Sequence, residues 1–171
     1  MNSKDVSLTA MLGALSAVAR VPFSAIPSLQ PSTFIIACTG YVFGPAKGFA
    51  VGALTAIVSS FFLGLGPWTI FQIIAWGLVG VFFAVLGKLK FPVWSLVVFG
   101  FLWGYVFGFI MNLWYLMAFG FPINIKSIIA LQLASFWMDT VHATGNAAFF
   151  IIFGKRVISI LSRFRQRLFQ D

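Results

Sequence analysis

The residues best suited to chemistry lie in the stretch SFWMDTVHATGN at residues 135–146, where an aspartate and the only histidine of the chain interrupt an apolar run. On a helix turning about 100° per residue, the polar residues here share an arc of roughly 80° on one face. They are Gln132, Ser135, Asp139, His142 and Asn146. Asp139 is the one acidic side chain away from the chain ends, because the other acids are Asp5 and Asp171. The pattern predicts a polar stripe along the last apolar helix.

The position of Asp139 leaves three interpretations open. A central aspartate costs about 2.5 to 3.5 kcal/mol on membrane-insertion scales, so it is expected to face a cavity or polar partners rather than lipid. The stripe lines a ligand cavity, or Asp139 and His142 form a hydrogen-bonded pair that locks helices together, or Asp139 relays protons in a proton-coupled carrier or channel.

Other chemistries are not favoured by the same residues. Asp139 and His142 supply two metal ligands, too few for a metal-ion carrier, and no metal site is predicted. HATGN contains a His-x-x-x-Asn pair, but an intramembrane serine protease needs a serine beside a base, and the chain has one histidine and no Gly-x-Ser-x-Gly. We therefore predict no enzymatic activity.

The composition says which elements must hold these residues. Hydrophobic residues make up 61% of the 171 residues and charged residues 8%, and the mean hydropathy is +1.03. These values indicate an integral membrane protein of a single domain, residues 1–171. Apolar segments without period-two alternation favour helices over a membrane β-barrel. The predicted fold class is all-α, and the predicted location is the cell membrane, with several crossings.

Polar and Pro/Gly breaks divide the chain into six apolar segments. They cover residues 6–24, 33–44, 48–64, 68–87, 92–118 and 127–153. With both termini cytoplasmic, nine basic residues fall on the inner side: Lys4, Lys47, Lys88, Lys90, Lys155, Arg156, Arg163, Arg165 and Arg167. Only Arg20 and Lys126 fall outside, so the positive-inside rule supports six transmembrane helices. The net charge of +8 is therefore interpreted as orientation and not as nucleic-acid binding.

Two of the segments fit this scheme less well. The first ends in SAVAR and has some features of a secretory signal, which we regard as the weaker interpretation. The second is too short to cross a hydrocarbon core of about 30 Å as a straight helix. We expect it to be shielded by its neighbours, with Cys38 as a buried, inert thiol.

A second group of polar and aromatic residues gathers toward the predicted outer side. Trp68, Gln72 and Trp76 recur at four-residue spacing and share one helix face. The next segment adds Asn112 and Tyr115, and two further residues, Arg20 and Gln30, flank the first outer loop. A lining of aromatics, amides and one guanidinium suits a large amphipathic organic ligand. Trp68 is equally consistent with an aromatic belt at the membrane interface.

Small residues at four-residue spacing predict close helix packing. They form the stripes Gly48, Gly52, Ala56 and Gly100, Gly104, Gly108, which we interpret as internal. The first segment carries the pairs Ala10 with Ala14 and Gly13 with Ala17. This alanine-rich helix lacks bulky residues on that stripe, so it is equally suited to presenting a flat face to another protein.

Six spans, an alanine-rich first helix and the stretches LQPSTFIIACTGYVFGPAKGFAVGA and GPWTIFQIIAWGLVG together resemble the substrate-binding S components of energy-coupling factor (ECF) vitamin transporters. The resemblance covers nearly the whole chain and is strongest to the cobalamin-type members. It implies a subunit that captures a vitamin from outside, with cobalamin as the expected ligand. It also implies docking, at alanines matched by Ala10 and Ala14, on a membrane coupling component with two ATPase subunits.

The remaining expectations follow from that resemblance and from what the chain lacks. The chain has no Gly-x-x-x-x-Gly-Lys-Ser/Thr loop, so ATP must be used by partner subunits, and no intrinsic cofactor is expected. Nickel and cobalt relatives carry an N-terminal histidine site, whereas residue 2 here is Asn2. Residues 155–171 form a basic cytoplasmic tail that is expected to continue as an amphipathic helix at the lipid headgroups or against a protein.

We predict ten ligand contacts and four docking residues. The ligand contacts are Arg20, Gln30, Trp68, Gln72, Trp76, Asn112, Tyr115, Gln132, Asp139 and His142. The docking residues are Ala10, Gly13, Ala14 and Ala17.

Overall fold

The computed structural model describes residues 3–169, and all regular structure in this range is helical. The α-helices are α1 (Ser3–Arg20), α2 (Ser32–Phe43), α3 (Pro45–Leu63), α4 (Trp68–Lys88), α5 (Ser95–Ala118), α6 (Ile125–Phe149) and α7 (Lys155–Phe169). A short 3-10 helix (Pro22–Ala25) follows α1, and a π-helical turn (Phe150–Gly154) joins α6 to α7. Each predicted apolar segment corresponds to one helix, and the predicted helical tail is α7. The all-α prediction is confirmed.

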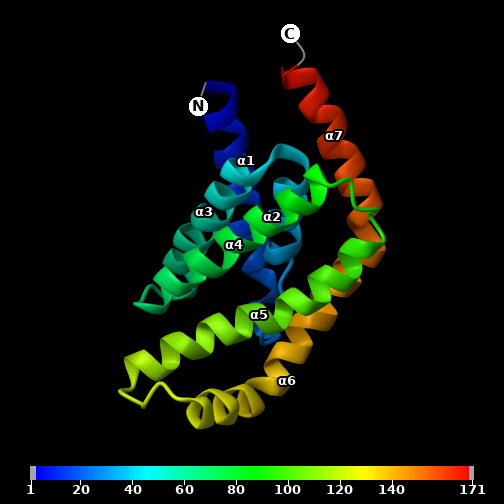
Figure 1. The fold of residues 1–171 in the computed structure, drawn as a ribbon. Coiled ribbons are helices and arrows are strands. Elements are labelled where there is room, and N and C mark those ends of the chain that lie inside the picture. The colour runs from blue at the N-terminus through cyan, green and yellow to red at the C-terminus, as the bar shows by residue number, and fades with distance from the viewer. Residues whose placement is uncertain (1–2, 170–171) are drawn as a thin grey trace.

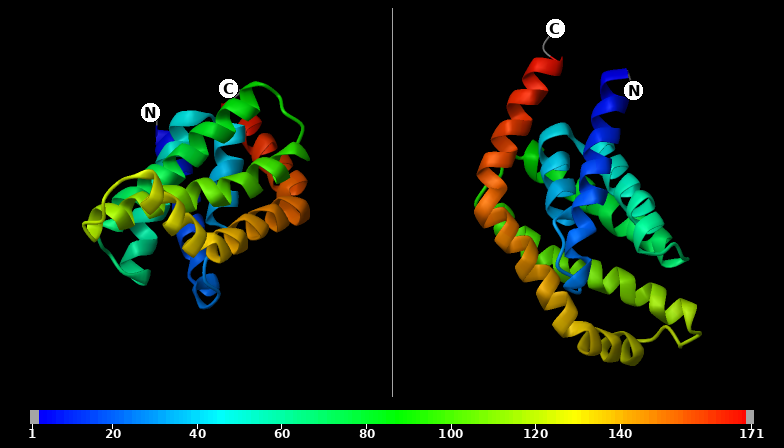
Figure 2. Two further views of the ribbon diagram at one scale, coloured as in Figure 1. Left: turned by 60° about the horizontal axis from the view of Figure 1, so that its bottom comes forward. Right: turned by 180° about the vertical axis from the view of Figure 1, so that it is seen from behind.

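The helices form two groups, and packing is closest within each group. Helices α1 to α4 pack against one another, and α5 forms a hairpin with α6 (Figure 1). The α3–α4 turn and the α5–α6 turn form two separate tips of the molecule (Figure 2). Helix α7 packs on α2, and α1 begins on the same side of the molecule on which α7 ends (Figure 1). The 3-10 helix and the loop after it lie at the opposite end of α1.

Glycines allow the closest approach within the first group. Gly48 of α3 lies against the backbone of Gly80 in α4, and a Cβ on either glycine would overlap the other's backbone. One turn further along α3, Gly52 lies against the backbone of Trp76. In the second group, Gly104 of α5 lies against Ala143 of α6. The internal role predicted for the two glycine stripes is therefore confirmed.

The π turn between α6 and α7 places an aromatic side chain in the core. Phe150 is buried and stacks on Phe83 with ring centroids 5.5 Å apart. It also lies against Gly100, where any added side chain would collide with its ring. The π turn thus coincides with the point where the α5–α6 hairpin joins the rest of the molecule.

Within residues 3–169, four helical stretches are long and apolar enough to cross a membrane. They are Ser3–Ala25, Pro45–Leu63, Trp68–Lys88 and Ser95–Ala118. Helix α2 is shorter, and most of its residues are buried among the other helices, as expected for a shielded segment. Cys38 lies there as a free, buried thiol. Helix α6 is not among the four, in keeping with its polar stripe, so the structure supports a membrane protein but leaves the count of six crossings a prediction.

Candidate functional site

A cavity of about 360 Å³ opens where α1 runs into the following loop. We call it the loop cavity. It is lined by Arg20, Phe23, Ser24, Ile26, Pro27, Ser28, Leu29, Gln30, Leu63 and Phe107. Most of the wall comes from the end of α1 and the α1–α2 loop, in which Ser28 adopts a left-handed conformation with φ 64°. Helices α3 and α5 contribute one side chain each. Two of the predicted ligand contacts, Arg20 and Gln30, meet in this cavity.

The side chain of Arg20 bends inward across the core and does not extend away from the protein. Its guanidinium lies over the Trp76 ring, with Cζ 4.9 Å from the ring centroid. Its NH1 group donates a hydrogen bond of 2.7 Å to the hydroxyl of Ser59 in α3. A cation over an indole is attracted by the ring quadrupole, and tryptophan is the strongest partner for this contact. Arg20 is therefore held at the wall of the loop cavity by α3 and α4.

An aromatic and polar chain lies behind Arg20. Trp76 is fully buried, and its ring centroid lies 5.2 Å from that of Phe107. The indole Nε1 of Trp76 donates to the hydroxyl of Thr33 at 3.1 Å. The same hydroxyl is 2.9 Å from Nε2 of His142. These hydrogen bonds join α4, α2 and α6. Phe107, which also contacts the imidazole of His142, lines the loop cavity.

The other predicted outer-side residues lie elsewhere. Trp68 packs edge-on against Trp114 at a centroid distance of 5.7 Å, and Trp114 in turn contacts Tyr115. Tyr115 is itself exposed. Gln72 is buried, and its carbonyl oxygen has no hydrogen-bond partner among the described residues. None of these residues lines the loop cavity, so their contact with a ligand stays a prediction.

Asp139 belongs to a separate polar cluster inside the α5–α6 hairpin. Its Oδ2 accepts hydrogen bonds from Gln132 at 2.6 Å and from Ser135 at 2.8 Å. Across the hairpin, the amide of Asn112 donates to Ser135 at 2.9 Å and to Gln132 at 3.3 Å. The carboxylate lies against Gly108, where a Cβ would overlap it. We name Asn112, Gln132, Ser135 and Asp139 the hairpin cluster.

The polar side chains of α6 do not all contact the same partners. Asp139 and His142 are not hydrogen-bonded partners, because His142 contacts Thr33 of α2 while Asp139 contacts residues of α6. Asn146 donates to the carbonyl of Gly100 at 3.1 Å and so also joins α6 to α5. The polar side chains share one face of α6, as predicted, but they contact different helices. Asp139 does not line the loop cavity, and its predicted contact with a ligand is left to experiment.

The four predicted docking residues of α1 divide into an exposed and a buried pair. Ala10 and Ala14 are exposed. Gly13 and Ala17 are buried, and a Cβ on Gly13 would come within 2.8 Å of Leu54 Cβ in α3. A surface presented to another protein therefore includes the first pair, whereas the second pair packs α1 onto α3.

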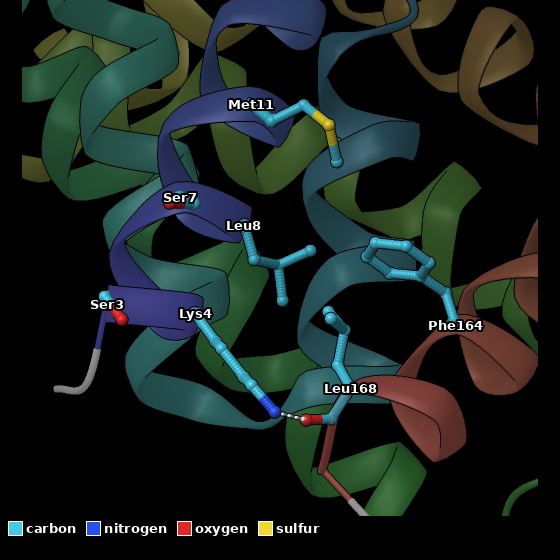
Figure 3. Close-up of a pocket in the computed structure, with 7 residues that line it drawn as sticks. All are labelled: Ser3, Lys4, Ser7, Leu8, Met11, Phe164 and Leu168. Carbon is cyan, nitrogen blue, oxygen red and sulfur yellow. Dashed lines mark hydrogen bonds between the residues drawn. The ribbon is translucent and has the colours of Figure 1, made fainter.

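A groove of about 320 Å³ lies between the start of α1 and α7 (Figure 3). Leu8 and Met11 of α1 face Phe164 and Leu168 of α7 across it. At its end, Nζ of Lys4 donates to the carbonyl oxygen of Leu168 at 3.0 Å. The groove adjoins the exposed face of α1 that carries Ala10 and Ala14.

Three residues of the loop-cavity region were not predicted from sequence. Thr33 and Ser59 are small hydroxyl residues inside apolar helices, where most such residues bond to their own backbone. Phe107 is one of 22 phenylalanines. None carries a local signal, and each acquires its role from a partner distant in sequence.

Within residues 3–169, no group of three or more His, Cys, Asp or Glu side chains gathers that would hold a metal ion.

The sequence model of the family described as "ECF transporter, substrate-specific component" matches residues 4–161, nearly the whole chain. No curated protein and no solved structure matches.

Proposed function

Because the chain belongs to the family of ECF transporter substrate-specific components, we propose that it captures a vitamin from outside the cell and delivers it inward when docked on an ATP-driven module. Members of this family are substrate-binding membrane subunits and work with a membrane T component and ATPases. The observation that carries the proposal is the loop cavity, which combines a guanidinium, an amide and aromatic walls in one recess.

The proposed topology has six crossings and cytoplasmic termini in the cell membrane. It is supported by the nine-to-two distribution of basic residues and by the common side on which α1 begins and α7 ends (Figure 1). In this orientation the loop cavity faces outward, as a capture site requires. The α1–α7 groove then faces the cytoplasm.

Cobalamin is the ligand suggested by the likeness of the sequence to cobalamin-type members. Its many amides suit the amide group of Gln30 in the loop cavity. However, a cavity of about 360 Å³ is near the lower end of the usual range for organic ligands, so cobalamin requires the α1–α2 loop to open. A smaller vitamin fits the cavity as it stands.

The proposed docking surface is the exposed face of α1 around Ala10 and Ala14. Two exposed alanines one turn apart let a partner helix approach closely. The α1–α7 groove adjoins this face and offers apolar side chains to the same partner, the T component. The chain has no phosphate-binding loop of its own, so ATP hydrolysis belongs to the two ATPase subunits.

The test is to purify the chain, identify by mass spectrometry what co-purifies, and then measure uptake in vesicles. Accumulation of that compound only when the T component, the ATPases and ATP are present supports the proposal. Uptake driven by a proton gradient in vesicles that contain this chain alone supports the rival, a proton-coupled carrier with Asp139 as relay. The hairpin cluster does not favour the rival, because the Asp139 carboxylate is bonded to an amide and a hydroxyl of its own helix.

A further inference from the structure

The charge of Arg20 is not balanced by any described residue. An arginine side chain stays protonated and offers five N–H donors. Among residues 3–169 this one donates a single hydrogen bond, to the uncharged Ser59. The Trp76 ring beneath it supplies no counter-charge, although it stabilises the cation.

Neither carboxylate in the described range pairs with Arg20. Asp5 lies fifteen residues earlier on the same helix, about 22 Å along the axis, and forms an ion pair of 2.9 Å with Lys47. Asp139 is bonded to Gln132 and Ser135 in the hairpin cluster. The third acid, Asp171, lies outside the described residues.

An inward-turned cation without a partner is costly in a low-dielectric setting. A side chain as long as arginine at the end of a membrane helix normally reaches outward to water or headgroups. Here the Arg20 side chain instead lies over the Trp76 ring at the wall of the loop cavity, where its remaining N–H groups are available to a ligand. This geometry is suited to an anionic group that arrives with the ligand.

The other residues of the loop cavity limit the size and polarity of the ligand. Its walls include Phe23, Ile26, Leu29 and Phe107, and the amide of Gln30 lies among them. A volume of about 360 Å³ suits a compact organic molecule. Resting on the function proposed above, we propose that the ligand of the loop cavity is a compact vitamin whose carboxylate or phosphate ester is bound by Arg20.

Matched pairs of probes separate the anionic group from the rest of the ligand. Three pairs compare an acid with its neutral analogue: biotin with biotin amide, nicotinate with nicotinamide, and pantothenate with panthenol. Pyridoxal 5′-phosphate with pyridoxal is the phosphate pair, and cobalamin is included alone. Binding to the purified full chain is measured by calorimetry for the wild type, Arg20→Gln and Arg20→Lys. The control is Lys126→Gln, which removes an exposed cation that does not line the cavity.

The expected result is that one acid or ester binds about 10- to 100-fold more tightly than its neutral partner, the range of one or two charge-assisted hydrogen bonds. Arg20→Gln should bring the two affinities to within about threefold, Arg20→Lys should retain part of the difference, and Lys126→Gln should retain all of it. Whether the carboxylate or the phosphate pair responds identifies the source of the anionic group. A ligand that co-purifies is judged by the same standard, and an anionic molecule supports the inference.

Other outcomes overturn the inference in distinguishable ways. If the preferred ligand is cobalamin, or is neutral or cationic, or if its affinity ratio is unchanged in Arg20→Gln, this inference is wrong while the vitamin-binding function stands. If neither the probes nor any co-purified compound binds, the proposed function fails and this inference fails with it. Should Arg20→Gln not fold, the acid-to-neutral ratio of the wild type and of Arg20→Lys still decides.

Discussion

Arg20 and Asp139 are both ionisable side chains set in apolar helices, yet the molecule surrounds them differently. Arg20 makes one hydrogen bond and one ring contact at the wall of a cavity. Asp139 accepts two hydrogen bonds within the α5–α6 hairpin, and its partners bond in turn to Asn112. A cation with unused N–H donors at a cavity wall is suited to binding, whereas a carboxyl group bonded to side chains within a helical hairpin is suited to holding the two helices together.

This difference can be tested by comparing ligand affinity with stability. Variants at the loop cavity should change affinity more than stability, and variants in the hairpin cluster should do the reverse. The expected effect on affinity falls in the order Arg20→Gln, Trp76→Phe, Asp139→Ala and Ala14→Leu. Stability is measured throughout by thermal aggregation of the ligand-free protein in detergent, and affinity by calorimetry with the ligand identified after purification.

Arg20→Gln should have the largest effect, a loss of about 10- to 100-fold in affinity. The ligand-free variant should be as stable as the wild type or more stable, because an unpaired cation no longer has to be held inside the protein. A marked loss of stability with unchanged affinity would place Arg20 with Asp139 as a structural ion and end the contrast.

Trp76→Phe should weaken binding about fivefold. The substitution keeps an aromatic ring under Arg20 but gives a weaker cation–π contact and removes the donor to Thr33. Phe82→Leu, a change in an aromatic residue of the same helix that does not line the loop cavity, is the comparison variant. An equal loss in both variants would mean that general packing of α4, and not the position of Arg20, controls affinity.

Asp139→Ala should change affinity by less than about threefold while lowering the aggregation temperature by about 2 to 12 °C, the shift expected for a loss of about 1 to 3 kcal/mol, because Gln132 and Ser135 lose their acceptor. Thr144→Ala, at an exposed position of the same helix, should cost less. A tenfold loss of affinity with unchanged stability would instead make Asp139 a ligand contact, as the polar stripe alone suggested.

Ala14→Leu should leave both affinity and stability unchanged, since the residue is exposed on α1. Uptake in vesicles with the T component and ATPases should nevertheless fall at least tenfold, because a bulky side chain prevents close approach of a partner helix. Ala148→Leu, also exposed but on α6, is the matched control and should transport normally. Normal uptake by Ala14→Leu would exclude this face as the docking surface.

Sequence reasoning predicted the elements of the fold well, because the signals are local. Apolar runs with Pro and Gly breaks located the helices, and glycines at four-residue spacing identified the faces of α3 and α5 that pack internally. The two stripes of α1 were not separated. Gly13 and Ala14 are neighbours in sequence but point about 100° apart, so one is buried while the other is exposed.

The candidate site was predicted only in part, because its contacts join distant segments. Arg20 and Gln30 were identified from their place beside a loop, but Thr33, Ser59 and Phe107 gave no local signal. Asp139 and His142 are three residues apart and point about 60° apart on the helix. That angle is enough to direct one into the α5–α6 hairpin and the other to α2, and periodicity alone does not say which neighbouring helix lies in either direction.

The π turn between α6 and α7 has a structural consequence. Helical backbone continues from residue 125 to residue 169 without a loop, about 65 Å along its curved path at the usual rise per residue. One continuous helical element therefore carries both His142, which contacts Thr33 beneath Trp76, and the α7 side chains that line the α1–α7 groove.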